Sequence, residues 1–284
     1  MIDDGHYTFE NAEKVAFLAQ ESGAEVFFRR YLGGDEFING FHRWILYLAD
    51  AAPAELRQLP MVRQRIAAVR QYRLSSSRPA TNRMADEPTR VGVDERLQAD
   101  FLVIPNTSSE NRDYIPIGWL SPDSIANQKL RILPEPSLYE FGVLTSRMHM
   151  TYMRAITGRL ESRYMYSVGV VYNTFPWPDA TPAQRAQVEA LAQAVLDARA
   201  LPKNATSTLA DLYDPDTMPA ELRRAHRELD LAVDRLYRAK PFASDRERVE
   251  HLFTLYQRLV DPLQNEGVRQ NRRVNRRARR QAAE

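Results

Sequence analysis

The sequence contains no cysteine, so disulfide bonds, thiolate catalysis and zinc sites built on cysteine are all excluded. It also contains no apolar run approaching the length that crosses a membrane. The N-terminal stretch MIDDGHYTF has neither the basic flank nor the hydrophobic segment of a secretion signal. These absences predict a soluble, cytoplasmic protein without a membrane partner.

Sequence motifs that support catalysis are missing as well. Gly33, Gly34 and Gly40 lack the strand-to-helix context of a cofactor-binding turn, and the chain has no P-loop, zinc-protease helix or serine nucleophile elbow. The Asn-Pro-Pro-Tyr type of tetrapeptide that holds a flipped adenine in amino-methyltransferases is also absent. The five histidines are scattered without ligand spacing, and Asp35 and Glu36 lack the nearby lysine of a metal nuclease. We therefore expect no catalytic residue, metal site or cofactor in this chain.

The composition is that of an ordinary globular protein, with 44% hydrophobic and 10% aromatic residues in 284 positions. Charge is unevenly distributed along it. Residues 261–284 carry seven arginines and three acidic residues, a net charge of +4, so the rest of the chain sums to −2 against a total of +2. Binding to a polyanion would therefore depend on local patches. The tail at 263–284 is predicted to be flexible, with phosphate contact or simple solubilisation as its alternative roles.

Hydrophobic patterning changes along the chain. Before Pro178, helical stretches alternate with strand-like segments such as GFHRWILYLAD, DFLVIPN, DYIPIGWL and ANQKLRILP. From residue 181 to 260 only helical periodicity is present, in three stretches with capping residues. The pattern predicts an α+β protein with a mixed α/β domain at 1–178, a helical bundle at 179–262 and the Arg-rich tail at 263–284.

Two polar segments interrupt the first domain. Residues 75–90, SSSRPATNRMADEPTR, lose all periodicity and are predicted to form a surface loop. Residues 107–112, TSSENR, form a turn whose hydroxyl groups usually satisfy the local backbone, which leaves Arg112 free to point outward. A loop with arginines and hydroxyls also suits contact with a DNA backbone, as an alternative to a plain surface loop.

The most informative stretch is residues 148–178, in which an amphipathic helix is followed by an alternating strand and an aromatic-proline segment, FPWP. Period-2 geometry places Glu161, Arg163 and Met165 on one strand face. A carboxylate can accept a hydrogen bond from cytosine N4, and a guanidinium can donate two to guanine O6 and N7, so an acid–arginine pair suits a C·G base pair. The alternative is an exposed intrastrand salt bridge, which is common and nearly neutral in energy.

The same stretch, MHMTYMRAITGRLESRYMYS followed by VVYNTFPWP, resembles the target-recognition region of the MmeI-like fused restriction–modification enzymes. These large bacterial proteins join a nuclease, an adenine methyltransferase and a DNA-reading region in one chain. Nearly the whole sequence apart from the tail shares the resemblance. Its further blocks are GGDEFINGFHRWILYLAD, NTSSENRDYIPIGWLSPDSIAN, LYEFGVLTSRMHM, LYDPDTMPAELRRAH and FASDRERVEHLFTLY.

The resemblance implies a part of an adenine-N6 DNA methyltransferase that recognises double-stranded DNA sequence. The methyltransferase domain, with or without a nuclease, and its S-adenosylmethionine would then be supplied elsewhere. It also implies that Glu161 and Arg163 occupy the positions of a coupled base-reading pair. Met165 departs from the arginine of the family, so a neighbouring base is left unread or is met through a thymine methyl group.

The resemblance adds candidates for contact with the DNA backbone or its surroundings, which are basic or hydroxyl-bearing residues of these segments: Arg78, Arg83, Arg90, Ser108, Ser109, Arg112 and Arg159. The competing function class is a protein-interaction module, or a remnant of a truncated methyltransferase, without DNA-reading activity.

Overall fold

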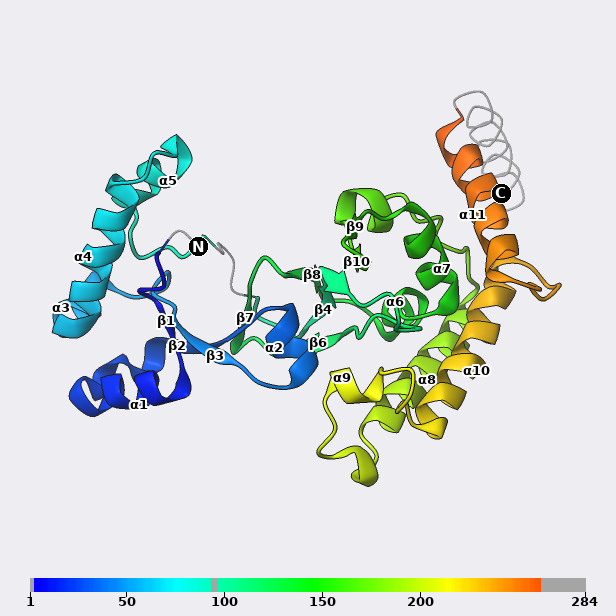
Figure 1. Ribbon diagram of the computed structural model, residues 1–284, viewed down its shortest axis with the longest axis horizontal. Helices are drawn as coiled ribbons and strands as arrows, with labels where there is room; N and C mark the ends of the chain where they lie inside the picture. Colours follow the sequence, from blue (N-terminus) through cyan, green and yellow to red (C-terminus); the bar gives the residue numbers. More distant parts are fainter. Residues whose placement is uncertain (1–2, 93–96, 262–284) are drawn as a thin grey trace, which may run out of the picture. The chain divides into compact units, whose positions relative to one another are not determined.

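The computed structural model describes residues 3–92 and 97–261, which form two compact units (Figure 1). The first unit takes in residues up to Thr107, Pro116–Pro136 and Thr206–Tyr213. The second takes in Ser108–Ile115, Ser137–Ala205 and residues from Asp214 onward. These units interleave along the sequence, and the domain boundary near Pro178 stays a prediction. The Arg-rich tail predicted at 263–284 lies outside the described residues.

The first unit contains a four-stranded sheet in the order β1-β3-β2-β7. Its strands are β1 (Thr8–Phe9), β2 (Phe28–Leu32), β3 (Arg43–Leu46) and β7 (Ser124–Ala126). The β2–β3 pair is antiparallel and the β2–β7 pair is parallel. Phe9, Phe17 and Phe28 pack edge to face with ring centroids 5.0–5.9 Å apart and form the centre of its core. The predicted strand in GFHRWILYLAD is confirmed by β3.

Four helices of the first unit lie between the strands of this sheet in the sequence and pack on its core. They are α1 (Asn11–Gln20), the 3-10 helix η1 (Ser22–Phe27), α3 (Pro53–Arg57) and α4 (Pro60–Leu74). Val62 and Val69 of α4 are fully buried, as their spacing predicts, and arginines occupy much of the rest of the helix surface.

A second, antiparallel sheet of the same unit has the order β6-β4-β8. Its strands are β6 (Gly118–Leu120), β4 (Phe101–Pro105) and β8 (Leu130–Pro134), and they match the segments predicted from DYIPIGWL, DFLVIPN and ANQKLRILP. Two short helices, α2 (Gly34–Asn39) and α9 (Leu209–Leu212), supply Phe37 and Leu209 to its core with Leu32, Phe101 and Val103.

Residues 75–90, which we predicted to form a surface loop, include two short helical segments. They contain α5 (Pro79–Arg83) and the 3-10 helix η2 (Met84–Asp86), and the chain around them is tied to α4 by the fully buried Arg73. The guanidinium of Arg73 donates to the backbone carbonyls of Met84, Glu87 and Arg90 at 2.9, 2.9 and 2.5 Å. One buried side chain therefore ties three carbonyls of this aperiodic segment to α4.

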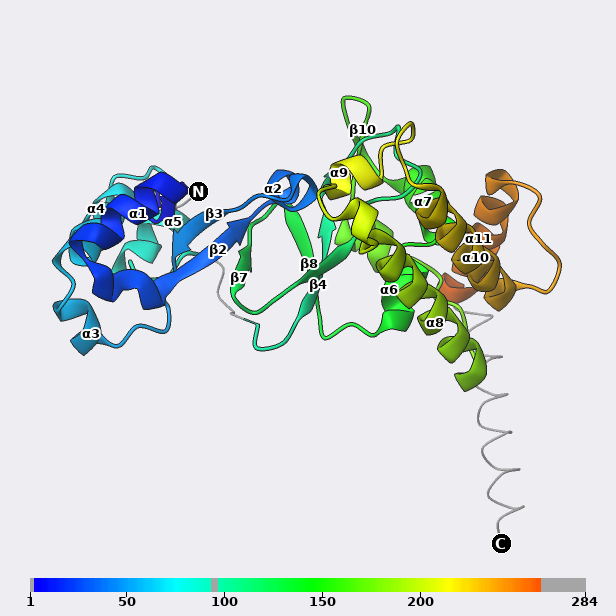
Figure 2. The same ribbon diagram turned by 90° about the horizontal axis from the view of Figure 1, so that it is seen from below.

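The second unit is mainly helical (Figure 2). Its helices are α6 (Leu138–Leu144), α7 (Arg147–Ile156), the π-helix η3 (Val168–Tyr172), α8 (Pro182–Arg199), the 3-10 helix η4 (Pro202–Asn204), α10 (Ala220–Tyr237) and α11 (Asp245–Val260). A capping box of Thr181 and Gln184 starts α8, one of the three capped helical stretches predicted. Between residues 181 and 260 every regular element is helical, which confirms the α+β prediction.

A polar cluster joins the helices of the second unit. The buried carboxylate of Asp230 accepts a hydrogen bond from the Tyr114 hydroxyl and another from the Arg147 backbone amide, each at 2.6 Å. Burial raises the pKa of Asp230 to about 6, although both hydrogen bonds favour the charged form. Arg248 pairs with Asp234 at 2.5 Å in the same region. The Asp230 contacts join the segment Ser108–Ile115 and α7 to α10, and the Arg248–Asp234 pair joins α11 to α10.

Close approach of α6 and α8 depends on Gly142. A Cβ atom at this position would lie 2.8 Å from Val188 Cγ1 and 3.2 Å from Ala192 Cβ, closer than side chains tolerate. Gly169, in contrast, has no atom within 4 Å of its notional Cβ. Substitution by alanine is therefore tested at Gly142, where space is lacking, and controlled at Gly169, where space is available.

We expect Gly142→Ala to lower the free energy of unfolding by about 1–2 kcal/mol because overpacking outweighs the helix propensity gained. Urea unfolding followed by circular dichroism measures this effect. Gly169→Ala is the control and should change stability by less than about 1 kcal/mol. Equal effects of the two substitutions would show that the α6–α8 contact does not depend on the glycine.

Candidate nucleic-acid interface

The predicted base-reading residues lie on an exposed β-hairpin of the second unit, which projects from the helices near α7 (Figure 2). Strands β9 (Arg159–Leu160) and β10 (Arg163–Met165) pair antiparallel, with Arg163 opposite Leu160. A two-residue turn, Glu161–Ser162, joins them. The prediction that Glu161 lies on the same strand as Arg163 and Met165 is therefore wrong, because the strand ends where the chain reverses.

The hairpin nevertheless brings the acid and the arginine together. Arg163 Nη2 lies 2.8 Å from Glu161 Oε2, and the two side chains are 47% and 76% exposed. An ion pair this exposed contributes little to stability. Its hydrogen-bonding groups are open to a partner that approaches the hairpin tip.

Alternation holds in the strand that follows the turn. Tyr164 and Tyr166 are buried, whereas Arg163 and Met165 are exposed, as period-2 geometry predicts. The Tyr166 hydroxyl lies 3.0 Å from Nε2 of His149 on α7. Burial lowers the pKa of His149 to about 3, so this imidazole is neutral near pH 7. The base of the hairpin is therefore anchored in the core while its tip is in solvent.

Arg159 is engaged inside the hairpin. Its guanidinium stacks on the Tyr164 ring at 4.5 Å, and its Nη1 donates to the Ser162 carbonyl at 3.0 Å. We predicted a contact between Arg159 and the DNA backbone or its surroundings. In the structure, Arg159 contacts Tyr164 and Ser162 of the hairpin itself and so stabilises the turn.

A neighbouring loop contributes Glu110, a residue that sequence reasoning missed. The Ser162 side chain lowers the pKa of the Glu110 carboxyl group, and the nearby charges of Arg159 and Arg163 lower it further. An exposed glutamate in a polar turn has no periodicity, and Ser162 lies 52 positions further along the sequence, so no local signal could have identified it.

The hydroxyl residues of the same loop differ from one another. Ser109 Oγ accepts from the Asn111 amide at 3.2 Å, the local role that such residues usually have in turns. Ser108 is only 3% exposed, which leaves it no surface to offer a DNA backbone. Arg112 is half-buried, and burial lowers its pKa, whereas we expected it to point freely outward.

Comparison with known protein families decides the relationship. Residues 1–179 match the model described as MmeI, target recognition domain, and residues 180–264 match MmeI, C-terminal domain. The chain belongs to the MmeI family. Among solved structures, it is similar to the Type IIL restriction–modification enzyme MmeI in complex with DNA, at 43% identity and a TM-score of 0.87.

Matching regions cover 90% of this chain and 34% of that MmeI chain. A curated relative, DNA methyltransferase A of Bacillus subtilis (strain 168), is 38% identical over 259 residues. That match takes in 91% of this chain and 29% of the relative. The chain thus spans about a third of the proteins that it resembles.

The other candidates of the MmeI-like chain for contact with a DNA backbone lie in the first unit. Arg78, Arg83 and Arg90 are exposed on or beside α5. Arg90 forms a 2.7 Å ion pair with Glu87. Because Arg73 binds the Arg90 carbonyl, the position of this arginine depends on a buried contact.

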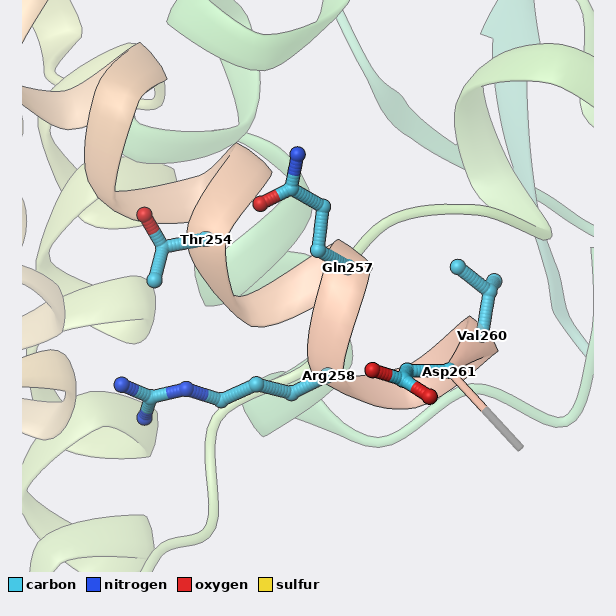
Figure 3. Close-up of a pocket in the computed structure, with 5 residues that line it drawn as sticks. All are labelled: Thr254, Gln257, Arg258, Val260 and Asp261. Atoms are coloured by element: carbon cyan, nitrogen blue, oxygen red, sulfur yellow. The ribbon is translucent and has the colours of Figure 1, made fainter. Parts of the chain in front are cut away.

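Within residues 3–92 and 97–261, no group of three or more His, Asp or Glu side chains is arranged to hold a metal ion. In the same ranges, no helix has the length and apolar character needed to span a membrane. A surface hollow of about 430 Å³ lies at the end of α11 and is lined by the five residues shown in Figure 3: Thr254, Gln257, Arg258, Val260 and Asp261. Its lining includes one basic side chain, Arg258, and one acidic side chain, Asp261.

Proposed function

We propose that this chain is the sequence-recognition part of a restriction–modification adenine-N6 DNA methyltransferase and that it reads double-stranded DNA with the β9–β10 hairpin. The observation that carries the proposal is the exposed Glu161–Arg163 pair at the hairpin tip of a chain from the MmeI family. The methyltransferase domain that binds S-adenosylmethionine would lie outside the matched third of the related proteins.

The chemistry of the pair suits base edges in the major groove. Glu161 supplies only acceptors and Arg163 only donors, which is the complement that a C·G pair presents through cytosine N4 and guanine O6 and N7. Each good bidentate contact discriminates by roughly 1–3 kcal/mol. Their mutual ion pair is exposed, so DNA can replace it at little cost to the folded state.

Charge around the tip supports base reading over simple phosphate attraction. Arg159 and Arg163 are balanced by Glu110 and Glu161, so the tip has no net charge. Phosphate affinity would then come from basic residues elsewhere, and the exposed Arg78, Arg83 and Arg90, on or beside α5, are the candidates. Because the tip lacks net charge, its contribution should be to sequence preference.

The competing function is a protein-interaction module that has lost DNA reading. Selection of bound duplexes from a randomised pool by the full chain, at about 150 mM salt, separates the two. We expect a short sequence to be enriched and to bind at least about 10³-fold more tightly than a scrambled duplex, with both affinities falling as salt rises. Recovery of the unenriched pool would contradict DNA reading.

A further inference from the structure

One stretch of the first unit holds a concentrated positive charge. Residues 56–85 contain seven arginines and no aspartate, glutamate or lysine, which gives a net charge of +7 in 30 positions. The whole chain carries only +2, so its other residues sum to −5. Charge this unevenly distributed produces a positive field over one part of the protein surface.

Two of the seven arginines are used by the fold. Arg73 is buried and binds the three carbonyls described above. Arg65 donates from Nη1 to the His6 carbonyl at 2.5 Å, and its guanidinium lies 4.1 Å from the centroid of the Phe9 ring. The other five are exposed and are called the arginine patch: Arg57, Arg63, Arg70, Arg78 and Arg83.

The guanidinium groups of the arginine patch have no partner. Within residues 3–92 and 97–261, none of them makes an ion pair or a side-chain hydrogen bond. Exposed arginines elsewhere differ, since Arg246 of α11 pairs at 2.8 Å with Glu250, four residues on. Such local pairs stabilise a solvated helix face, and residues 56–85 offer no acid to form one. The charge of the patch is therefore open to an anionic partner.

Helix α4 carries the centre of the patch. Arg63 and Arg70 are seven residues apart, so they lie on the same side of the helix, two turns or about 10 Å from each other. Gln64 and Ala67 lie between them and are also exposed. The amide adds a hydrogen-bond donor, and the small Ala67 side chain leaves room for a partner to approach the helix.

The short helices at the two ends of α4 add the remaining members (Figure 1). Helix α3 ends at Arg57, whereas α5 is preceded by Arg78 and ends at Arg83. Both helices contact α4. The patch thus continues beyond the two turns that separate Arg63 from Arg70.

We propose that α4, through Arg63 and Arg70, is a helix that binds the backbone of the DNA duplex, and that the arginines of α3 and α5 extend this contact. The inference rests on the proposed function, because the duplex is the one that the hairpin of the second unit reads. A duplex carries about one charge per 1.7 Å of its axis, so a helix face of this length meets several phosphates. Guanidinium and amide donors bind phosphate oxygens without regard to base sequence. The patch supplies affinity and the hairpin supplies preference.

The test measures binding of the full chain to a scrambled duplex and to the preferred duplex over a series of salt concentrations. Arg63→Gln with Arg70→Gln should weaken binding of both duplexes by the same factor, about 10–30-fold at roughly 150 mM salt. The slope of log K against log salt should become shallower by about 1.8, the value for two lost phosphate contacts. The ratio of the two affinities should stay within about twofold of that of the unchanged chain.

Two matched variants show whether the loss comes from charge at this place. Arg224→Gln with Arg227→Gln removes the same charge from the exposed surface of α10 and should alter neither the slope nor the affinity by more than about twofold. Arg63→Lys with Arg70→Lys keeps the charge and should retain the slope of the unchanged chain. A lysine variant with the slope of the glutamine variant would overturn the inference, because the loss would then not report charge.

The inference and the proposed function fail separately. If the chain prefers one sequence but the Arg63→Gln and Arg70→Gln variant binds scrambled DNA with unaltered affinity and slope, the inference is wrong and base reading stands. That result is also expected if the patch binds an acidic protein. If the chain prefers no sequence but this variant loses affinity and slope as described, the proposed function is wrong and phosphate binding by α4 stands.

Discussion

Exchange of the hairpin pair, Glu161→Lys with Arg163→Asp, is expected to reverse the base preference at one position of the recognised sequence from C·G to G·C. The donor and the acceptor trade places on the hairpin, and the two base edges trade places in the duplex. The measurement is methylation of duplexes that differ at this position, with the chain joined to its catalytic half, together with binding of the same duplexes by the chain alone. Discrimination of roughly 1–3 kcal/mol should change sign.

Affinity for unrelated DNA should hardly change in this double variant, because the exchange preserves net charge and phosphate contacts lie elsewhere. A matched control is Arg227→Asp with Glu228→Lys, which makes the same charge exchange on the exposed face of α10 and should leave the preference unaltered. If the hairpin variant keeps the original preference and merely binds more weakly, Glu161 and Arg163 are a structural ion pair.

Sequence periodicity predicted one half of the hairpin correctly. Residues 163–166 alternate between solvent and core: Tyr164 and Tyr166 are buried, and Tyr166 contacts His149. Period-2 reasoning failed at Glu161 because the turn Glu161–Ser162 lacks the Asn-Gly or Asp-Gly signal of a tight hairpin. The pair still converged, because Glu161 in the turn is only two residues before Arg163 and their side chains meet at 2.8 Å.

Contacts between distant segments account for what the sequence could not show. Ser162 and the arginines of the hairpin lower the pKa of Glu110, and nothing near Glu110 in the sequence indicates these residues. Helical stretches after residue 181 were predictable since each has its own apolar stripe and capping residue, such as Thr181. Local order in the protein was therefore readable from sequence, whereas the surroundings of the hairpin tip were not.

Residues 75–90 show the same limit of prediction from sequence, because their structure depends on the buried charged residue Arg73. Arg73 occurs on a helix with several other arginines, and composition alone does not distinguish it from Arg70, which is exposed. Only the fold shows that Arg73 is fully buried and that its donors satisfy three carbonyls of the following segment. The segment that looked like a loop is tied to α4 by this residue, so part of its stability depends on one guanidinium.

Arg73→Met is therefore expected to lower the free energy of unfolding by about 3–5 kcal/mol, since it removes a buried guanidinium and three partly buried hydrogen bonds to backbone carbonyls. Methionine retains most of the apolar length of the side chain, so the loss reports the guanidinium contacts and not a large cavity. Arg70→Met, on the exposed side of the same helix, should change stability by less than about 0.5 kcal/mol. Chemical unfolding of the full chain measures both, and hydrogen exchange at residues 84–90 should accelerate only in the Arg73 variant. Equal stability of the two variants would mean that the Met84, Glu87 and Arg90 carbonyls find other donors, and that the shape of this segment does not depend on Arg73.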